Sequence, residues 1–166
     1  MSPLVVLVGP PGSGKSTVAA LVAEATRTGH RDTDADVEAK AGKPISDIFV
    51  DSGEAAFRAL ERDAVVDALT YDGVVSLGGG AILDPAIRAD LRGHRVVFLD
   101  VGLAEAAKRV GLGTSRPLLL GNVRGRLKKL MDDRRPLYTE VATLTVETDG
   151  RTPEDIAAEI LTKVVT

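Results

Sequence analysis

Short runs of apolar, β-branched residues alternate along the chain with longer segments whose apolar residues recur every three or four positions. Runs of the first kind, bounded by glycine or charge, are typical of buried strands, and segments of the second kind predict amphipathic helices. The expected strands are Leu4 to Val8, a weaker run at Arg31 to Thr33, Val74 to Leu77, Val96 to Leu99 and Val141 to Val146. The expected helices are Lys15 to Thr26, Ala35 to Ala41, Ile45 to Asp51, Glu54 to Thr70, Pro85 to Leu91, Leu103 to Val110, Val123 to Met131 and Pro153 to Val165.

Strands that alternate with helices predict an α/β fold, in which a mostly parallel sheet is covered by helices on both faces. Ligands of such sheets bind beyond the carboxyl ends of the strands. One stretch, "VGLGTSRPLLLGN" at residues 110–122, fits neither pattern. A long loop bounded by glycines in a compact domain is more often functional than not.

Composition narrows the classes of function. The 166 residues suit one domain, residues 1–166, and 44% apolar with 27% charged residues is ordinary globular usage. A net charge of −3 and an aromatic content of 3% argue against a nucleic-acid partner. Without cysteine the chain has no disulfide or thiolate metal site, and it fits a reducing compartment. The first apolar run is too short for a signal peptide or a membrane span, so we expect a cytoplasmic protein.

The segment "GPPGSGKST", residues 9–17, follows the first strand and opens the first helix. It matches the P-loop pattern GxxxxGK[ST] in the required context, although a plain glycine turn with a capping serine is the alternative. The glycines would let backbone N–H groups turn around the β-phosphate of a nucleotide. Lys15 would reach the β- and γ-phosphates, and the Ser16 hydroxyl would bind Mg²⁺. The predicted nucleotide-binding residues of this loop are Gly12, Ser13, Gly14, Lys15, Ser16 and Thr17.

Other features distinguish between kinds of P-loop protein. A GTPase would need a base-reading NKxD motif, and the sequence has none. The usual Mg²⁺ carboxylate of these proteins follows an apolar strand, and Asp100 after "VVFL" offers one. The strand "VVSL" ends instead in Gly78, Gly79 and Gly80. Three glycines there suggest backbone pressed against a small molecule, although a flexible turn before the next helix would use the same residues.

The chain resembles the shikimate kinases in several separate segments that span nearly its whole length. These segments are "GPPGSGKST" at 9–17, "DTD" at 32–34, "ISDIF" at 45–49, "GEAAFRALE" at 53–61, "SLGGGA" at 76–81, "RPLL" at 116–119 and "RRPLYTEVA" at 134–142. The resemblance implies a three-layer P-loop fold with a five-stranded parallel sheet in the order 2-3-1-4-5. It also implies a substrate-binding segment at about 34–61 and a mobile lid at about 111–122.

The same resemblance implies an activity. A shikimate kinase transfers the γ-phosphoryl group of ATP to the 3-hydroxyl of shikimate, with Mg²⁺, in aromatic amino acid biosynthesis. We therefore expect shikimate and ATP as the small-molecule partners, no membrane partner, and a monomeric enzyme.

Shikimate is a cyclic carboxylate, and arginines suit it because their planar forks make paired charge-assisted bonds. The resemblance places this clamp at Arg58 and Arg134, leaves Arg135 in solvent, and puts the backbone N–H of Gly79 on the substrate. By sequence alone, Arg58 could equally be an exposed arginine paired with a glutamate one turn away. Glu61 is expected to hold the rotamer of Arg58. The residues expected to bind substrate are Asp34, Arg58, Gly78, Gly79, Gly80, Arg134, Ile45, Phe49, Phe57, Glu61, Pro117 and Leu118, although core packing would also explain Phe49 and Phe57.

By resemblance the predicted lid closes over ATP and carries Arg116. A lid arginine would stabilise charge on the transferred phosphoryl group, although a loop arginine in solvent is the alternative. Arg109 resembles the residue that stacks on adenine, and Arg151 with Pro153 resembles the far wall of the adenine pocket.

The segment "RDTDAD", residues 31–36, places three carboxylates beside the phosphate site. We expect Asp32 to face Mg²⁺ bound by Ser16, and prefer it to Asp100 for this role. Asp34 would accept the proton of the acceptor hydroxyl. Asp36 would lie in the first turn of the next helix, where its negative charge interacts favourably with the helix dipole. The predicted catalytic residues are Asp34, Lys15 and Arg116, and the predicted metal-binding residues are Ser16 and Asp32.

Two other functions fit part of the sequence. A second small P-loop kinase of hydroxylated acids, such as a gluconate kinase, would also need arginines for a carboxylate, but "RPLL" and "RRPLY" favour a shikimate kinase. A nucleotide-binding regulatory protein without catalysis would have little need for Lys15, Ser16, Asp34 and Arg116 together.

Overall fold

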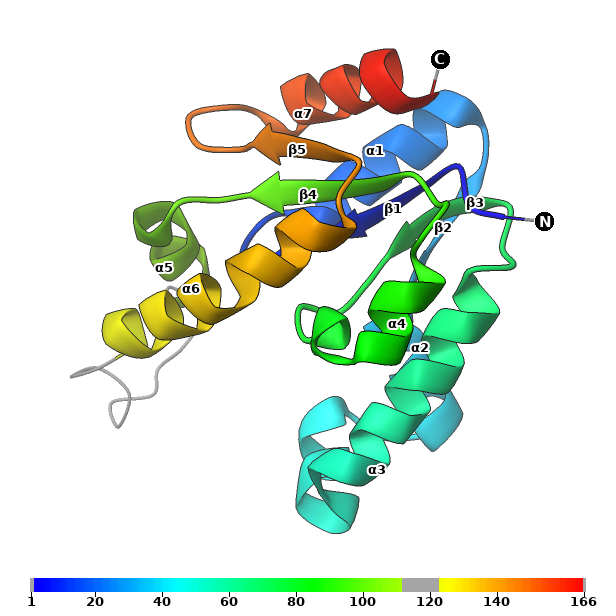
Figure 1. Cartoon of the computed structure of the whole chain (residues 1–166), viewed down its shortest axis with the longest axis vertical. Coiled ribbons are helices and arrows are strands. Elements are labelled where there is room, and N and C mark those ends of the chain that lie inside the picture. Colours follow the sequence, from blue (N-terminus) through cyan, green and yellow to red (C-terminus); the bar gives the residue numbers. More distant parts are fainter. Residues whose placement is uncertain (1, 112–122, 166) are drawn as a thin grey trace.

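The computed structural model describes residues 2–111 and 123–165. Its centre is a parallel sheet in the order β2-β3-β1-β4-β5 (Figure 1). This order confirms the predicted α/β fold. The strands are β1 (Val5–Val8), β2 (Gly29–Asp32), β3 (Gly73–Ser76), β4 (Val96–Asp100) and β5 (Leu144–Glu147).

Helices cover both faces of the sheet, as the sequence predicts (Figure 1). Val5 and Leu7 of β1 pack in one core cluster with residues of α1 and α7, whereas Val6 and Val8 pack in another with α3, α4 and α6. All four residues of β1 are buried because successive side chains alternate between two covered faces. The helices are α1 (Lys15–Thr26), α2 (Thr33–Ala41), α3 (Ile45–Ala68), α4 (Pro85–Asp90), α5 (Leu103–Gly111), α6 (Val123–Val141) and α7 (Pro153–Ile160), with a 3₁₀ helix at Ala81–Leu83 and a π-helical turn at Leu161–Val165.

The second strand and second helix meet earlier than predicted. The strand ends at Asp32, and α2 begins at Thr33 instead of Ala35. The carboxylate of Asp32 accepts hydrogen bonds from the N–H groups of Asp34 (2.8 Å) and Ala35 (3.4 Å). These N–H groups have no partner within the helix, so a capping aspartate lets α2 start directly after the strand.

Helix α6 is longer than predicted, because the sequence analysis ended it at Met131 and the helix continues to Val141. Pro136 lies inside it and removes one backbone hydrogen bond. The helix persists because Tyr138 belongs to the sheet core and Leu137 packs against it. For the same reason β5 begins at Leu144, three residues after the predicted start at Val141.

Helix α3 contains the break that the sequence predicts between two helices. Gly53 has φ 85° and ψ 171°, a left-handed backbone that favours glycine. The part before Gly53 carries Ile45 and Phe49, and the part after it carries Arg58. Helices α2 and α3 together extend away from the sheet (Figure 1).

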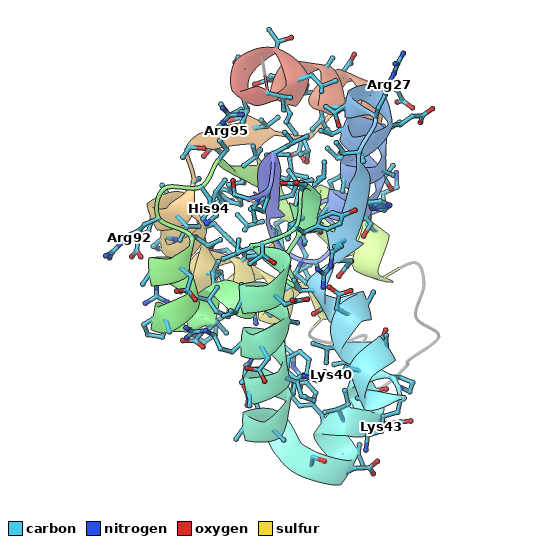
Figure 2. The ribbon with its side chains drawn as sticks, turned by 90° about the vertical axis from the view of Figure 1, so that its right-hand side faces the viewer. Arg27, Lys40, Lys43, Arg92, His94 and Arg95 are labelled. Carbon is cyan, nitrogen blue, oxygen red and sulfur yellow. The ribbon has the colours of Figure 1, made fainter. Side chains whose placement is uncertain are left out.

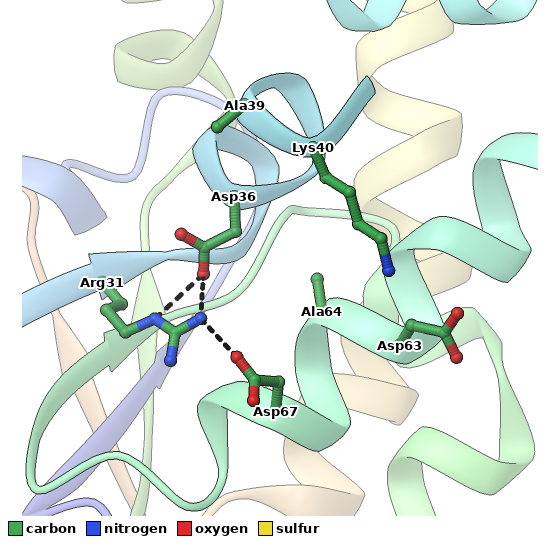
Figure 3. A pocket seen from close by; sticks show the side chains of 7 residues that line it. All are labelled: Arg31, Asp36, Ala39, Lys40, Asp63, Ala64 and Asp67. Carbon is green, nitrogen blue, oxygen red and sulfur yellow. Dashed lines mark hydrogen bonds and ion pairs between the residues drawn. The ribbon is translucent and has the colours of Figure 1, made fainter. Parts of the chain in front are cut away.

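Arg31 fastens β2 to the helix pair α2 and α3 (Figure 3). Its guanidinium group pairs with Asp36 of α2 at 2.9 Å and with Asp67 of α3 at 2.8 Å, and it lies over the ring of Tyr71. Arg31, Asp36 and Asp67 line a cavity of about 530 Å³ together with other residues of α2 and α3. None of its lining residues belongs to the P-loop or to the glycines after β3, so this cavity is not the candidate active site.

Several basic side chains lie at separate places on the surface (Figure 2). The labelled basic residues are Arg27 after α1, Lys40 and Lys43 near the junction of α2 and α3, and Arg92, His94 and Arg95 before β4.

No helix among the described residues is long and apolar enough to cross a membrane.

Candidate active site

The P-loop joins β1 to α1 at the carboxyl edge of the sheet. Gly12 and Gly14 have φ 80° and 87°, so the loop uses the left-handed backbone that glycine adopts without strain. Gly14 caps α1 without a side-chain hydrogen bond, which leaves the first N–H groups of the helix to a ligand. A loop of this form at a helix N-terminus is an anion site.

Lys15 folds back over this loop. Its ammonium group donates to the carbonyl oxygens of Gly9 (2.7 Å) and Pro10 (3.2 Å). Burial lowers the pKa of Lys15 to about 8, against the opposing effect of Asp34 and Asp32, whose negative charges raise it. The lysine ammonium group is therefore held at the loop by carbonyl groups.

The three carboxylates of "RDTDAD" have different surroundings. One oxygen of Asp32 caps α2, and the other accepts a hydrogen bond of 3.4 Å from the Ser16 hydroxyl. Asp36, in the first turn of α2, pairs with Arg31. Asp34 lines a cavity that neither Asp32 nor Asp36 lines. The structure therefore places Ser16 and Asp32 together, as the predicted metal site requires.

The competing carboxylate, Asp100, is already engaged. It ends β4 and pairs with Arg135 at 2.6 Å, and the Arg135 guanidinium also lies over the ring of Phe98. Arg135 is exposed, as expected of the solvated arginine, and its ion pair also joins α6 to β4. The pairing supports the preference for Asp32 over Asp100 as the metal-side carboxylate.

Asp34 lies at the junction of the phosphate site and a cavity of about 180 Å³. Burial raises its pKa to about 6, and the charges of Asp32 and Glu61 add to this, while Lys15 lowers it. A carboxylate with a pKa near working pH can accept a proton from a bound hydroxyl. The cavity is lined by Pro11, Asp34, Ile45, Phe49, Phe57, Arg58, Glu61, Gly79, Gly80 and Arg134.

Most of the predicted substrate residues thus meet in one place. Phe49 and Phe57 stand on one side with ring centroids 4.9 Å apart. Phe57 is 4% exposed and Phe49 38% exposed, so Phe57 belongs to the core as well as to the cavity. Pro11 is a lining residue that the sequence analysis did not assign to substrate, because the P-loop motif already accounted for it.

Arg58 and Glu61 form a partly buried pair in this cavity. Arg58 donates to the Glu61 carboxylate at 2.8 Å, and Glu61 is only 2% exposed. Burial raises the pKa of Glu61, and the hydrogen bond and charge of Arg58 offset only part of this rise. Arg58 also lies over the Phe57 ring and contacts Glu54 at 3.7 Å. The guanidinium group is therefore held in one direction, towards the cavity, by contacts on several sides.

Close contacts explain two of the three glycines after β3, Gly78 and Gly80. A Cβ on Gly78 would overlap the carboxylate of Asp34, and one on Gly80 would lie 2.9 Å from both terminal nitrogens of Arg58. Gly79 faces Arg134. The sequence suggests that a small molecule requires these glycines, and the structure shows that Asp34 and Arg58 leave no room for a Cβ at Gly78 and Gly80. Gly78 itself contacts Asp34 and does not line the cavity.

Of the predicted adenine residues, Arg109 contacts the P-loop, and Arg151 and Pro153 lie at the start of α7. Arg109 of α5 donates to the Gly12 carbonyl at 2.8 Å. Arg151 precedes α7, pairs with Glu159 at 2.7 Å, and is followed by Pro153 in the first turn of α7. Asp149 accepts hydrogen bonds from the N–H of Gly102 at 3.0 and 3.2 Å and so ties the loop after β5 to the loop after β4.

Most of the predicted lid, residues 112–122, lies outside the described residues. Arg116, Pro117 and Leu118 lie outside the described residues. Their assignments therefore stay predictions.

Taken together, a 2-3-1-4-5 parallel sheet, a P-loop and a neighbouring cavity with two arginines and a carboxylate define a P-loop kinase of a small acidic molecule. Residues 11–165 match the family described as shikimate kinase. The chain belongs to the shikimate kinase family, whose members are ATP-dependent kinases.

Curated relatives and solved structures agree with this family. The chain is 59% identical over 162 residues to the shikimate kinase of Thermobifida fusca, covering 97% of this chain and 94% of that protein. It is 60% identical over 161 residues to that of Salinispora arenicola, covering 96% of each. The shikimate kinase from Acinetobacter baumannii in complex with shikimate superposes with a TM-score of 0.88 at 35% identity, covering 97% of this chain and 91% of that one.

Proposed function

We propose that this protein transfers the γ-phosphoryl group of ATP to the 3-hydroxyl of shikimate, giving shikimate 3-phosphate and ADP. One observation carries the proposal: Arg58, Arg134 and Asp34 line one cavity, and the P-loop residue Pro11 lines it too. A relative at 35% identity is named as a complex with shikimate. We also propose that the protein is a cytoplasmic monomer that acts in aromatic amino acid biosynthesis.

The two arginines would bind the carboxylate of shikimate. Arg58 is oriented by the buried Glu61, and Arg134 projects from α6 on the other side of the glycines. Each charge-assisted contact contributes about 1.5 to 3 kcal/mol. The apolar carbon face of the ring would pack against Ile45, Phe49 and Phe57.

Asp34 would orient the acceptor hydroxyl and accept its proton. Its raised pKa of about 6 makes it a better proton acceptor than an ordinary aspartate while leaving it mostly ionised at neutral pH. Lys15 would move from the loop carbonyls to the β- and γ-phosphates. Because the transition state of phosphoryl transfer is largely loose, positioning and charge neutralisation matter more here than a strong base.

Ser16 and Asp32 would hold Mg²⁺. A hydroxyl and a carboxylate oxygen that already share a hydrogen bond fit the hard-oxygen preference of this ion, which takes its other ligands from phosphates and water. No group of three or more acidic or histidine side chains in the described part of the chain forms a metal cluster, which accords with so few protein ligands. Bound there, Mg²⁺ would neutralise charge on the β- and γ-phosphates.

Two further roles complete the proposal. Arg109 would lie on one face of adenine, which fits its hydrogen bond to the P-loop residue Gly12, and Arg151 with Pro153 would form the opposite wall. Arg116, with Pro117 and Leu118, would close over both substrates from the lid.

A coupled ADP-release assay tests the proposal. Purified protein with ATP and Mg²⁺ should release ADP with shikimate and release little with gluconate at the same concentration. Turnover of gluconate in place of shikimate would instead support the kinase of another hydroxylated acid. Nucleotide binding without turnover of any hydroxyl acceptor would support a regulatory protein.

A further inference from the structure

Tyr138 lies on α6, one helical turn after Arg134, and is 1% exposed. Residues four apart share one face of a helix, so both side chains leave α6 on the same side. The ring of Tyr138 stacks on Phe98 of β4, with centroids 4.9 Å apart and planes inclined by 23°. The core therefore fixes the ring and, with it, the position of the hydroxyl group.

The Tyr138 hydroxyl donates a hydrogen bond of 2.6 Å to the carbonyl oxygen of Gly79. In a trans peptide the carbonyl and the following N–H point in opposite directions. Holding the Gly79 carbonyl towards Tyr138 therefore turns the N–H of Gly80 away from it. The preceding peptide is oriented in the same manner, because the Gly78 carbonyl accepts from the N–H of Ala81 at 3.1 Å.

These oriented peptides border the substrate cavity. Neither the N–H of Gly79 nor that of Gly80 donates to another residue in the part of the chain that the structure describes. Both glycines line the cavity together with Arg58 and Arg134. Unpaired N–H groups beside guanidinium groups are suited to the oxygen atoms of an anionic ligand.

Arg134 lies one helical turn before Tyr138 on α6. Burial raises the pKa of Tyr138 to about 12, and the positive charge of Arg134 opposes this rise. The hydroxyl therefore keeps its proton at any pH at which the enzyme would work, and it stays a donor to Gly79. Tyr138 thus shares one face of α6 with Arg134 and donates from there to the glycine backbone.

We infer that Tyr138 is a positioning residue, which fixes the Gly79–Gly80 peptide relative to Arg134 so that backbone N–H groups and the guanidinium meet the same shikimate molecule. Tyr138 is not among the lining residues of the cavity and acts through its hydrogen bond to the Gly79 carbonyl. The inference rests on the proposed function and adds to it the residue that sets the geometry of substrate binding.

Tyr138→Phe tests the inference, because it removes the hydroxyl and keeps the ring on Phe98. The KM for shikimate should rise about 5- to 10-fold, with the KM for ATP unchanged. The chain offers a matched control in its other tyrosine, Tyr71, which packs against the same core cluster and lies under Arg31. Tyr71→Phe should leave both KM values unchanged.

An unchanged KM for shikimate in Tyr138→Phe would overturn the inference, and so would an equal rise in both KM values, which indicates general loss of packing. If that variant does not fold, Phe98→Leu keeps the hydroxyl and loosens the ring, and it should give the same selective rise. If the unmodified protein does not turn over shikimate, the proposed function fails. Calorimetric binding of shikimate to both proteins then tests Tyr138 separately.

Discussion

At the scale of single residues, the negative charge of Asp34 lowers the stability of the fold but is required for the proposed catalysis. Its pKa of about 6 in the folded protein exceeds the value near 4 of an unfolded chain. The folded state therefore binds this proton more tightly, and stability falls as pH rises from about 4 to about 6. The charge of Asp34 is a cost to the fold that the proposed chemistry requires.

Asp34→Asn should separate these two consequences. We expect the free energy of unfolding at pH 7 to rise by about 1 kcal/mol, a figure reduced for the partial exposure of the group. Turnover of shikimate should fall by about 10² to 10⁴. Denaturant unfolding and initial rates measure the two effects, and an unchanged rate would remove the role of proton acceptor.

The pKa values of Asp34 and Lys15 also predict a bell-shaped pH dependence. Below about pH 6 the protonated Asp34 cannot accept a proton, and above about pH 8 Lys15 loses the charge that binds phosphate. The kcat/KM for shikimate, measured from about pH 5 to about pH 9, should fall on both sides. In Asp34→Asn the acidic fall should disappear and the alkaline fall should remain; a profile still falling below pH 6 would point to another group.

At the scale of elements, the glycines after β3 serve two different side chains. Gly78→Ala would displace the Asp34 carboxylate, and Gly80→Ala would displace the Arg58 guanidinium. We therefore expect Gly78→Ala to lower kcat at least tenfold, and Gly80→Ala mainly to raise the KM for shikimate, by about tenfold. Steady-state kinetics of both variants serve as each other's control, and identical effects would contradict this division.

The elements also show where sequence patterns stop being informative. The strand core of β1 and the P-loop are marked by apolar runs and glycines, so they were predicted closely. The end of α6 was not, because Pro136 is a local signal against helix, whereas packing of Leu137 and Tyr138 on the sheet stabilises the helix through long-range contacts.

At the scale of the whole molecule, substrate binding should stabilise the fold. Shikimate at one hundred times its Kd adds about 2.7 kcal/mol, which raises the Tm by about 5 to 10 °C for a chain of this size. Arg134→Ala should abolish this rise and keep the rise caused by ADP. Thermal unfolding with each ligand measures both.

Arg135→Ala is the matched control for this experiment. Arg135 adjoins Arg134 but pairs with Asp100, so its loss should lower the starting Tm slightly and leave the shikimate-induced rise intact. If the Arg135 variant lost the rise and the Arg134 variant kept it, the clamp would be assigned to the wrong arginine.

The sequence by itself determined the order of strands and helices along the chain and the phosphate loop, because these depend on local periodicity and on short motifs. Only the tertiary structure decided which groups meet: Asp100 with Arg135, Asp34 with Gly78, and the Tyr138 hydroxyl with the Gly79 carbonyl. Asp100 and Arg135 are 35 positions apart, Asp34 and Gly78 are 44 apart, and Gly79 and Tyr138 are 59 apart. Such contacts depend on how the elements pack around the sheet, and no local pattern encodes that packing.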